Sequence, residues 1–160
     1  MLYHPKRVRN EIIDTNEIKS LIKQGNHITL ALCDNNIPYI VTMSYGYDGN
    51  KKYIYFHCAN KGDKLDYIKK NSNVIGTIIK DNGYLKTKCD HDYESLIIRG
   101  KIFIIESLEE KKHGLQILLN HLEENTKPIF DRNIKNDESY IKVTILRLEI
   151  ESVIGKKYIG

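Results

Sequence analysis

Residues 38–70, PYIVTMSYGYDGNKKYIYFHCANKGDKLDYIKK, decide the fold and hold most of the candidate site. Two runs rich in Tyr, Ile and Val, 39–47 and 52–58, flank the turn residues Asp48-Gly49-Asn50, which predicts a β-hairpin. A polar loop and a short amphipathic helix follow. The stretch therefore indicates a unit of two strands, a loop and a helix.

The loop before that helix is cationic. Lys61 and Lys64 flank Gly62, where the helix is expected to begin. Free backbone N–H groups at a helix N-terminus attract an anion, and neighbouring ammonium groups strengthen the attraction. The loop is therefore a candidate phosphate site. The alternative is an ordinary solvated loop.

The same stretch resembles the flavin-binding core of the pyridoxamine 5′-phosphate oxidase-like superfamily, and especially its nitroimidazole-reductase-like branch. Members of that branch read approximately P-Y-V-V-P-L-x-Y-G-Y-D and then L-Y-F-H-x-A-x-x-G-x-K. The resemblance begins at His4-Pro5-Lys6-Arg7 and reaches Gly155-Lys156-Lys157, so it covers nearly the whole chain. It implies an FMN-binding split barrel, a homodimer with two flavin sites at the subunit interface.

Size and composition are those of one globular domain. The chain has 160 residues, of which 41% are hydrophobic and 29% charged, so it can form a core without disulfide or metal support. We expect residues 1–160 to form a single FMN-binding split-barrel domain. No apolar run is long enough to span a membrane, and the N-terminus lacks a signal-peptide core, so we expect a cytoplasmic protein without a membrane partner.

Charge and cysteine content favour a small acidic ligand over nucleic acid or a metal. The net charge of +4 is dispersed along the chain, which suits an acidic small ligand and does not indicate nucleic acid. Cys33, Cys58 and Cys89 lack the spacing of a metal knuckle, so we expect reduced thiols. The cluster Cys89-Asp90-His91-Asp92 has no second Cys or His pair nearby, so we predict a plain loop over 81–92 and no metal site.

Apolar periodicity predicts the remaining elements. Two helices are expected, one capped by Asp14 with Glu17 three residues later and ending at Gly25, and one from Ser107 to about Glu123. Further strands are expected at 27–33, 74–79, 93–106 and 140–152. The total is six strands and three helices, which we interpret as a mainly β fold, an antiparallel β barrel with peripheral helices.

Local irregularities are expected at three places in the strands. Gly76 indicates a bulge or a close backbone approach, and Gly100 indicates a bend in the longest strand. The apolar positions of 140–152 change parity, which predicts a bulge near Ile145. Residues 124–139, which include Pro128, are expected to form a loop.

The flavin contacts follow from the resemblance. It places the flavin ring against the strand Ile40-Val41-Thr42-Met43-Ser44, whose backbone edge offers alternating donors and acceptors. Ser44 stands where more distant oxidases carry a phosphate-binding lysine. Lys64 matches the last basic residue of the family's G-R-K, but Asp63 replaces the arginine. Lys61 then compensates for the missing charge, or Asp63 caps the helix with its carboxylate turned away.

Two further positions match polar residues of the family. His57, after Phe56, matches the histidine of F-H-x-A, which implies contact with the flavin and proton donation to a substrate, so His57 is the catalytic candidate. Ser95 aligns with a polar flavin contact. The alternatives are a structural histidine and an outward polar residue of a half-buried strand. The basic residues Lys6, Arg7 and Arg9 contact the ligand or a partner subunit, or form a solvated arm.

These features predict an FMN-dependent oxidoreductase that reduces a small organic acceptor such as a nitroaromatic. A reduced nicotinamide would bind transiently at the flavin, because the chain has no G-x-G-x-x-G motif. One alternative is a non-catalytic flavin or haem carrier with His57 as an iron ligand. Another is an OB-like barrel that binds single-stranded nucleic acid through its tyrosines.

Overall fold

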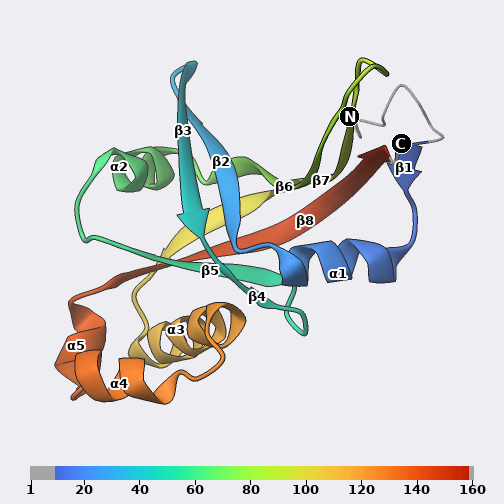
Figure 1. Cartoon of the computed structure of the whole chain (residues 1–160). Coiled ribbons are helices and arrows are strands. Elements are labelled where there is room, and N and C mark those ends of the chain that lie inside the picture. The colour runs from blue at the N-terminus through green and yellow to red at the C-terminus, as the bar shows by residue number, and fades with distance from the viewer. Residues whose placement is uncertain (1–9, 159–160) are drawn as a thin grey trace.

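The computed structural model describes residues 10–158, and its centre is an antiparallel β-sheet of eight strands (Figure 1). The strands are β1 (Glu11–Ile12), β2 (His27–Asp34), β3 (Ile37–Ser44), β4 (Gly46–Asp48), β5 (Tyr53–Cys58), β6 (Asn73–Leu85), β7 (Asp90–Ile105) and β8 (Thr144–Tyr158). Their order is β3-β2-β6-β7-β8-β5-β4, and β1 pairs with β8. The mainly β, antiparallel class expected from the sequence is confirmed.

Five helices surround the sheet within the described residues. They are α1 (Thr15–Gln24), α2 (Asp63–Lys70), α3 (Leu108–Leu122), α4 (Lys127–Asn133) and α5 (Asp137–Ile141). Figure 1 shows α3, α4 and α5 grouped together, while α2 lies at another side of the sheet, near β2 and β3. None of the helices in this part of the chain is long and apolar enough to cross a membrane.

Alternation along β2 divides the sheet into an inner and an outer face. Ile28, Leu30 and Leu32 are at most 2% exposed and belong to the main core, as the sequence predicts. Thr29 and Ala31 face outward, because successive side chains of a strand point to opposite faces. The inner face of the sheet therefore forms the barrel core, and the outer face of β2 is not part of it.

The two helices predicted from their caps are confirmed. Asp14 accepts a hydrogen bond from the Asn16 N–H at 2.8 Å, and Ser107 accepts one from the Glu110 N–H at 3.4 Å. The capping box at α1 is not completed, because the Glu17 carboxylate pairs with Lys157 at 2.5 Å instead. Both helix starts are thus fixed by a side chain close in sequence.

The hairpin predicted for 39–47 and 52–58 is correct only in its second half. β4 pairs with β5, but β3 pairs along its whole length with β2, through a turn in which Asn35 and Asn36 both have positive φ. Tyr45 interrupts the predicted strand: its ring is fully buried, and its hydroxyl donates to the Ile22 carbonyl at 2.5 Å. This tertiary contact separates β3 from β4.

The predicted loop over 81–92 is wrong, because most of it is paired strand. Asp81 to Leu85 of β6 pair with Asp90 to Tyr93 of β7, with a register shift between Asp81 and Gly83. Polar side chains bond across this hairpin, for example Asn82 to Asp92 at 2.9 Å. Polar residues on both faces leave no apolar alternation that would reveal the strands.

The predicted bend at Gly100 is confirmed, while the bulge predicted near Ile145 lies elsewhere. The register between β7 and β8 shifts at Arg99 and Gly100, and Glu151 is the extra residue on β8. A Cβ on Gly100 would lie 1.9 Å from the Glu149 carbonyl oxygen. The apolar positions of β8 switch from odd to even numbers at Ile145, because Ile145 packs under α3 whereas Leu146 lies in the barrel core.

Of the two alternatives predicted for Gly76, the structure has the close approach and not the bulge: Gly76 lies at no register shift, and a Cβ there would lie 2.7 Å from Ile28 Cδ1. Two other sequence-based details are corrected. Residues 124–139 are not a plain loop: α4 has Pro128 in its first turn, and the Asn136 side chain caps α5. The expected six strands and three helices omitted the short β1, β4, α4 and α5.

Candidate functional site

β3 is the terminal strand of the sheet path, so one of its backbone edges has no strand neighbour within the described chain. Ile40, Thr42 and Ser44 are exposed, Val41 is half-buried, and Met43 is 9% exposed against the core. The Thr42 hydroxyl lies 2.9 Å from that of Thr29 on β2. The strand predicted to contact the flavin thus presents a free edge and three outward side chains.

The cationic loop lies at the start of α2, as predicted. Gly62 is the N-cap residue, with φ of 135°, and no side chain caps the helix. Asp63 is therefore the first helical residue and not the cap. Lys61 is exposed and Lys64 half-exposed, and neither forms a hydrogen bond or ion pair with another described residue. Two ammonium groups are thus available for an anion at this helix end.

Contacts at both ends of the loop and helix hold this unit beside β3. The Asn60 amide donates to the Lys142 carbonyl at 2.9 Å, and its oxygen accepts from the Thr144 hydroxyl at 2.7 Å. On the helix, the Tyr67 ring stacks on Tyr39 of β3 with 5.0 Å between the centroids. The loop is therefore positioned by residues that do not themselves carry the charge.

The end of β5 contributes one accessible side chain. His57 is exposed, and its ring has no hydrogen bond to another described residue, whereas Phe56 is fully buried in the core. Only the main chain of Phe56 is therefore available to a ligand. Burial raises the pKa of the Cys58 thiol, and nearby Lys64 offsets part of that rise. Cys58 thus lacks the lowered pKa of an activated nucleophile.

Ser95 is not brought next to β3 within one chain. It lies on β7, with β2 and β6 between the two strands, which places it roughly 14 Å across the sheet. Its hydroxyl donates to the Lys156 carbonyl at 3.5 Å. Ser95 also lines a cavity of ≈ 320 Å³ together with His27 and Ile79. A ligand on β3 would contact Ser95 only if a second copy supplied it.

The outward side of β3, β2, β6 and β7 forms what we term the uncovered sheet face. Ile40 on β3 is 70% exposed, and Ile75 and Ile79 on β6 are 36% and 60% exposed. Ala31 of β2 joins them, because it is the cross-strand partner of both Ile40 and Ile75. A sheet face with exposed apolar side chains is typical of an interaction surface.

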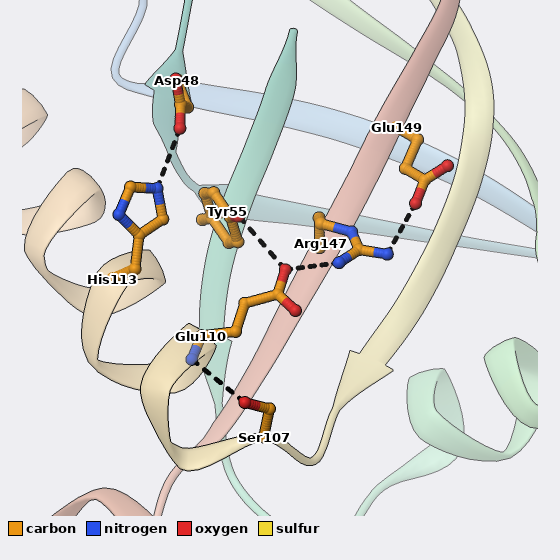
Figure 2. A network of polar contacts seen from close by, with 7 residues as sticks. All are labelled: Asp48, Tyr55, Ser107, Glu110, His113, Arg147 and Glu149. Atoms are coloured by element: carbon orange, nitrogen blue, oxygen red, sulfur yellow. Dashed lines mark hydrogen bonds and ion pairs between the residues drawn. The ribbon is translucent and has the colours of Figure 1, made fainter. Parts of the chain in front are cut away.

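The sequence did not reveal a second polar region, which lies under α3 (Figure 2). Asp48 is only 5% exposed; its carboxylate accepts from the N–H groups of Asn50 and Lys51 and pairs with His113 Nε2 at 2.9 Å. Burial raises the pKa of the Asp48 carboxyl, but these hydrogen bonds outweigh burial and hold the pKa below its ordinary value.

Glu110 on α3 completes the network in Figure 2 by joining β5 to β8. It accepts from the Tyr55 hydroxyl at 3.3 Å and pairs with Arg147, which also pairs with Glu149 at 2.6 Å. The Arg147 guanidinium lies 5.0 Å from the Tyr53 ring. Because these charges pair with one another, we interpret the network as holding α3 on the barrel.

Residues 10–158 were also searched for a metal site. The structure contains no cluster of three or more His, Cys, Asp or Glu side chains able to hold an ion there. His91 instead pairs with Asp81 at 2.6 Å, and Cys89 is exposed. The predicted ligand or subunit contacts of Lys6, Arg7 and Arg9 lie outside the described residues.

Comparison with models of known protein families shows the family to which this chain belongs. The family model described as pyridoxamine 5′-phosphate oxidase matches residues 14–157. The chain belongs to this family. A sequence comparison with curated proteins found no match. The predicted family is therefore confirmed.

Several solved structures are similar in fold to this chain. One from Bacteroides thetaiotaomicron, named for 5-nitroimidazole antibiotic resistance, shares 27% identity over 91% of this chain and 85% of that chain, with a TM-score of 0.77. The flavocytochrome Anf3 from Azotobacter vinelandii shares 13% identity over 99% and 73% of the two chains, with a TM-score of 0.82.

A protein from Mycobacterium smegmatis named for FAD and haem binding has a TM-score of 0.80 at 13% identity, over 94% of this chain and 74% of that chain. The two matches at 13% identity bear on the fold alone. Together with the family match, they confirm the split-barrel fold that the sequence predicted. Of the positions singled out from the sequence, Asp63 is the first residue of α2, and Ser44 is the last residue of β3.

Proposed function

We propose that this chain binds FMN along β3 and the α2 loop and uses it to reduce a small organic acceptor, with a nitroaromatic as the candidate class. The observation that carries the proposal is the free backbone edge of β3 in a split barrel that also holds unpaired Lys61 and Lys64 at a helix start. The name of the B. thetaiotaomicron relative supports the choice of acceptor.

The residues present fit the chemical demands of FMN. A dianionic phosphate needs cations and N–H donors, which Lys61, Lys64 and the first turn of α2 provide. The hydrogen-bonding edge of a flat ring needs alternating donors and acceptors, which the free edge of β3 provides. The Asp63 carboxylate opposes phosphate binding, so the second lysine is needed to restore a net positive loop.

In this proposal the cofactor would transfer electrons, and the protein would hold the ligand and donate a proton. Bound FMN would supply the two-electron transfer. Thr42 and Ser44 would donate hydrogen bonds to the polar parts of the ligand, because their hydroxyls are exposed beside the β3 edge. His57 would donate a proton to the reduced acceptor, since its ring is exposed and free of hydrogen bonds to described residues.

A homodimer forms part of this proposal. The apolar uncovered sheet face would be covered by a second copy, and Ser95 of that copy would then reach a ligand held on β3. The separation of Ser95 from β3 within one chain supports this arrangement. A site shared between two copies also excludes water from both sides of the ring.

The visible absorption spectrum of purified protein after FMN addition tests the proposal. We expect the flavin band to remain with the protein through gel filtration, and reduced nicotinamide to support reduction of a nitroimidazole. His57→Gln should retain the flavin and lose most turnover. Failure of the folded protein to retain FMN supplied in excess would refute the proposal. A Soret band after haem addition would favour the alternative in which exposed His57 is an iron ligand.

A further inference from the structure

The cavity that Ser95 lines lies where two neighbouring strands of the sheet separate. Within the described chain, β2 pairs with β6 only over residues 29–31. The next outward position of β2, His27, does not pair with β6, although it still pairs with Ser44 of β3. Because His27 and Ile79 of β6 both line the cavity, it occupies this separation. The cavity therefore lies next to the Ser44 end of β3 within a single chain.

The inner wall of the cavity is apolar, and its charges cancel. Leu21 of α1, Ile78 of β6 and Leu96 of β7 line it and are at most 6% exposed. The Lys80 and Glu94 side chains also line it, and they form an ion pair at 2.6 Å. A charged molecule would lose its hydration in such a cavity without gaining a free counter-charge. The wall therefore favours an uncharged ligand.

The edge of the cavity carries hydrogen-bond donors. Gln24, Asn26 and His27 line it and are exposed. The Gln24 amide donates to the Ser20 hydroxyl at 2.8 Å, whereas the side chains of Asn26 and His27 form no hydrogen bond with another described residue. Amide and imidazole N–H groups donate to oxygen atoms. Two donors are thus available to a ligand at the edge of an apolar cavity.

The turn that carries these donors, residues 24–27, is held in place by close packing. A Cβ on Gly25 would lie 2.6 Å from the Tyr45 hydroxyl oxygen and 2.9 Å from Ile78 Cγ2. On the same residue, the Gly25 carbonyl accepts a hydrogen bond from His121 Nε2 at 2.7 Å. The edge of the cavity is therefore formed before a ligand arrives, which lowers the entropic cost of binding.

The size of the cavity limits its occupant. Ligand cavities range from about 300 to 1,000 Å³, so a cavity of ≈ 320 Å³ holds a molecule of about one ring and not a dinucleotide. We propose that this cavity binds the electron acceptor, and that the acceptor is a small uncharged aromatic molecule whose oxygen atoms accept from Asn26 and His27. The inference rests on the proposed function, in which the flavin lies along β3, because the cavity adjoins the Ser44 end of that strand.

Chemical-shift perturbation in isotope-labelled, flavin-free protein tests the proposal. The probes are para-nitrobenzamide and para-nitrobenzoate, which share the nitro-substituted ring and differ in charge. The uncharged amide should shift the backbone signals of residues 24–27 and 78–80. The benzoate should bind at least about tenfold more weakly. In the FMN-loaded protein, KM should follow the same order.

Variants at the end of α1 locate the binding. Gln24→Trp places a large ring at the edge of the cavity and should weaken para-nitrobenzamide binding at least about tenfold. Lys23→Trp is the matched control, because Lys23 is the preceding exposed residue of the helix and does not line the cavity. It should bind as the wild type does. Asn26→Ala removes one donor and should weaken binding about fivefold.

Three results would overturn the assignment. The first is absent binding of para-nitrobenzamide or equal affinity for the two probes, and the second is equal binding by Gln24→Trp and Lys23→Trp. The third is displacement of para-nitrobenzamide by FMN, because the cavity would then belong to the cofactor. If the wild type retains no FMN, the proposed function fails, while binding to the flavin-free protein still decides what the cavity holds.

Discussion

On the α3 side of the barrel, Asp48, Glu110 and Arg147 each have a charged or ring partner within the chain. On the α2 loop, Lys61 and Lys64 have none among the described residues. This difference in pairing distinguishes side chains that stabilise the fold from side chains that a ligand could contact. Charges that satisfy one another fix α3 on the sheet, whereas unpaired charges beside a free strand edge remain available for a ligand.

The contrast also appears in how closely the two regions pack. Under α3, a Cβ on Gly46 would lie 2.4 Å from Leu118 Cα, and one on Gly114 would lie 2.7 Å from Tyr55 Cδ1. At the start of α2, a Cβ on Gly62 would meet nothing within 4 Å. The α3 side is thus closely packed at both glycines. The space at the α2 loop is open, and the positive φ of Gly62 alone restricts substitution there.

The largest expected effect is on the closed side. Asp48→Asn removes the carboxylate that contacts His113 and weakens the turn that Asp48 caps, so we expect a loss of about 2 kcal/mol in the free energy of unfolding at neutral pH. The exposed pair of Lys127 and Asp131, joined at 2.5 Å, is the control. Asp131→Asn should change stability by less than about 0.5 kcal/mol in the same urea titration.

The pH dependence of stability sharpens this prediction. The pKa of Asp48 is lower in the folded protein than in the unfolded chain, so its contribution is complete above the unfolded value of 3.8 and is lost as the pH falls through the folded value. The stability difference between wild type and Asp48→Asn should therefore shrink in acid, below about pH 4. An equal difference at neutral and acidic pH would contradict the assigned role of Asp48.

A smaller effect is expected on the open side, in binding and not in stability. Lys64→Ala removes one cation from the loop and should weaken FMN binding about tenfold, with an unchanged unfolding midpoint. Lys69→Ala, an exposed lysine in the last turn of the same helix, is the control and should bind FMN as the wild type does. Equal affinities for the Lys64→Ala and Lys69→Ala variants, measured by flavin fluorescence, would remove the phosphate assignment.

Local signals made most of the fold predictable. The alternation of β2 and the caps Asp14 and Ser107 act within a few residues, and the structure confirms them. The break at Tyr45 was missed because its cause is a hydrogen bond to the Ile22 carbonyl, 23 residues away. The 81–92 hairpin was missed because its strands are polar on both faces, so no periodicity marks them.

The candidate site was predictable in part for the same reason. The loop with Lys61 and Lys64 and the strand from Ile40 to Ser44 are continuous in sequence, and a family resemblance identified them. The pair of Asp48 and His113 joins residues 65 positions apart. No local pattern in the sequence would reveal this pair.

Hydrogen exchange measured by mass spectrometry, with and without FMN, tests the contrast between the two regions most directly. The account predicts slower exchange on FMN addition at the amides of β3 and of residues 61–64, and unchanged exchange across α3. Protection confined to α3 and the network around Glu110, with none on β3, would contradict it.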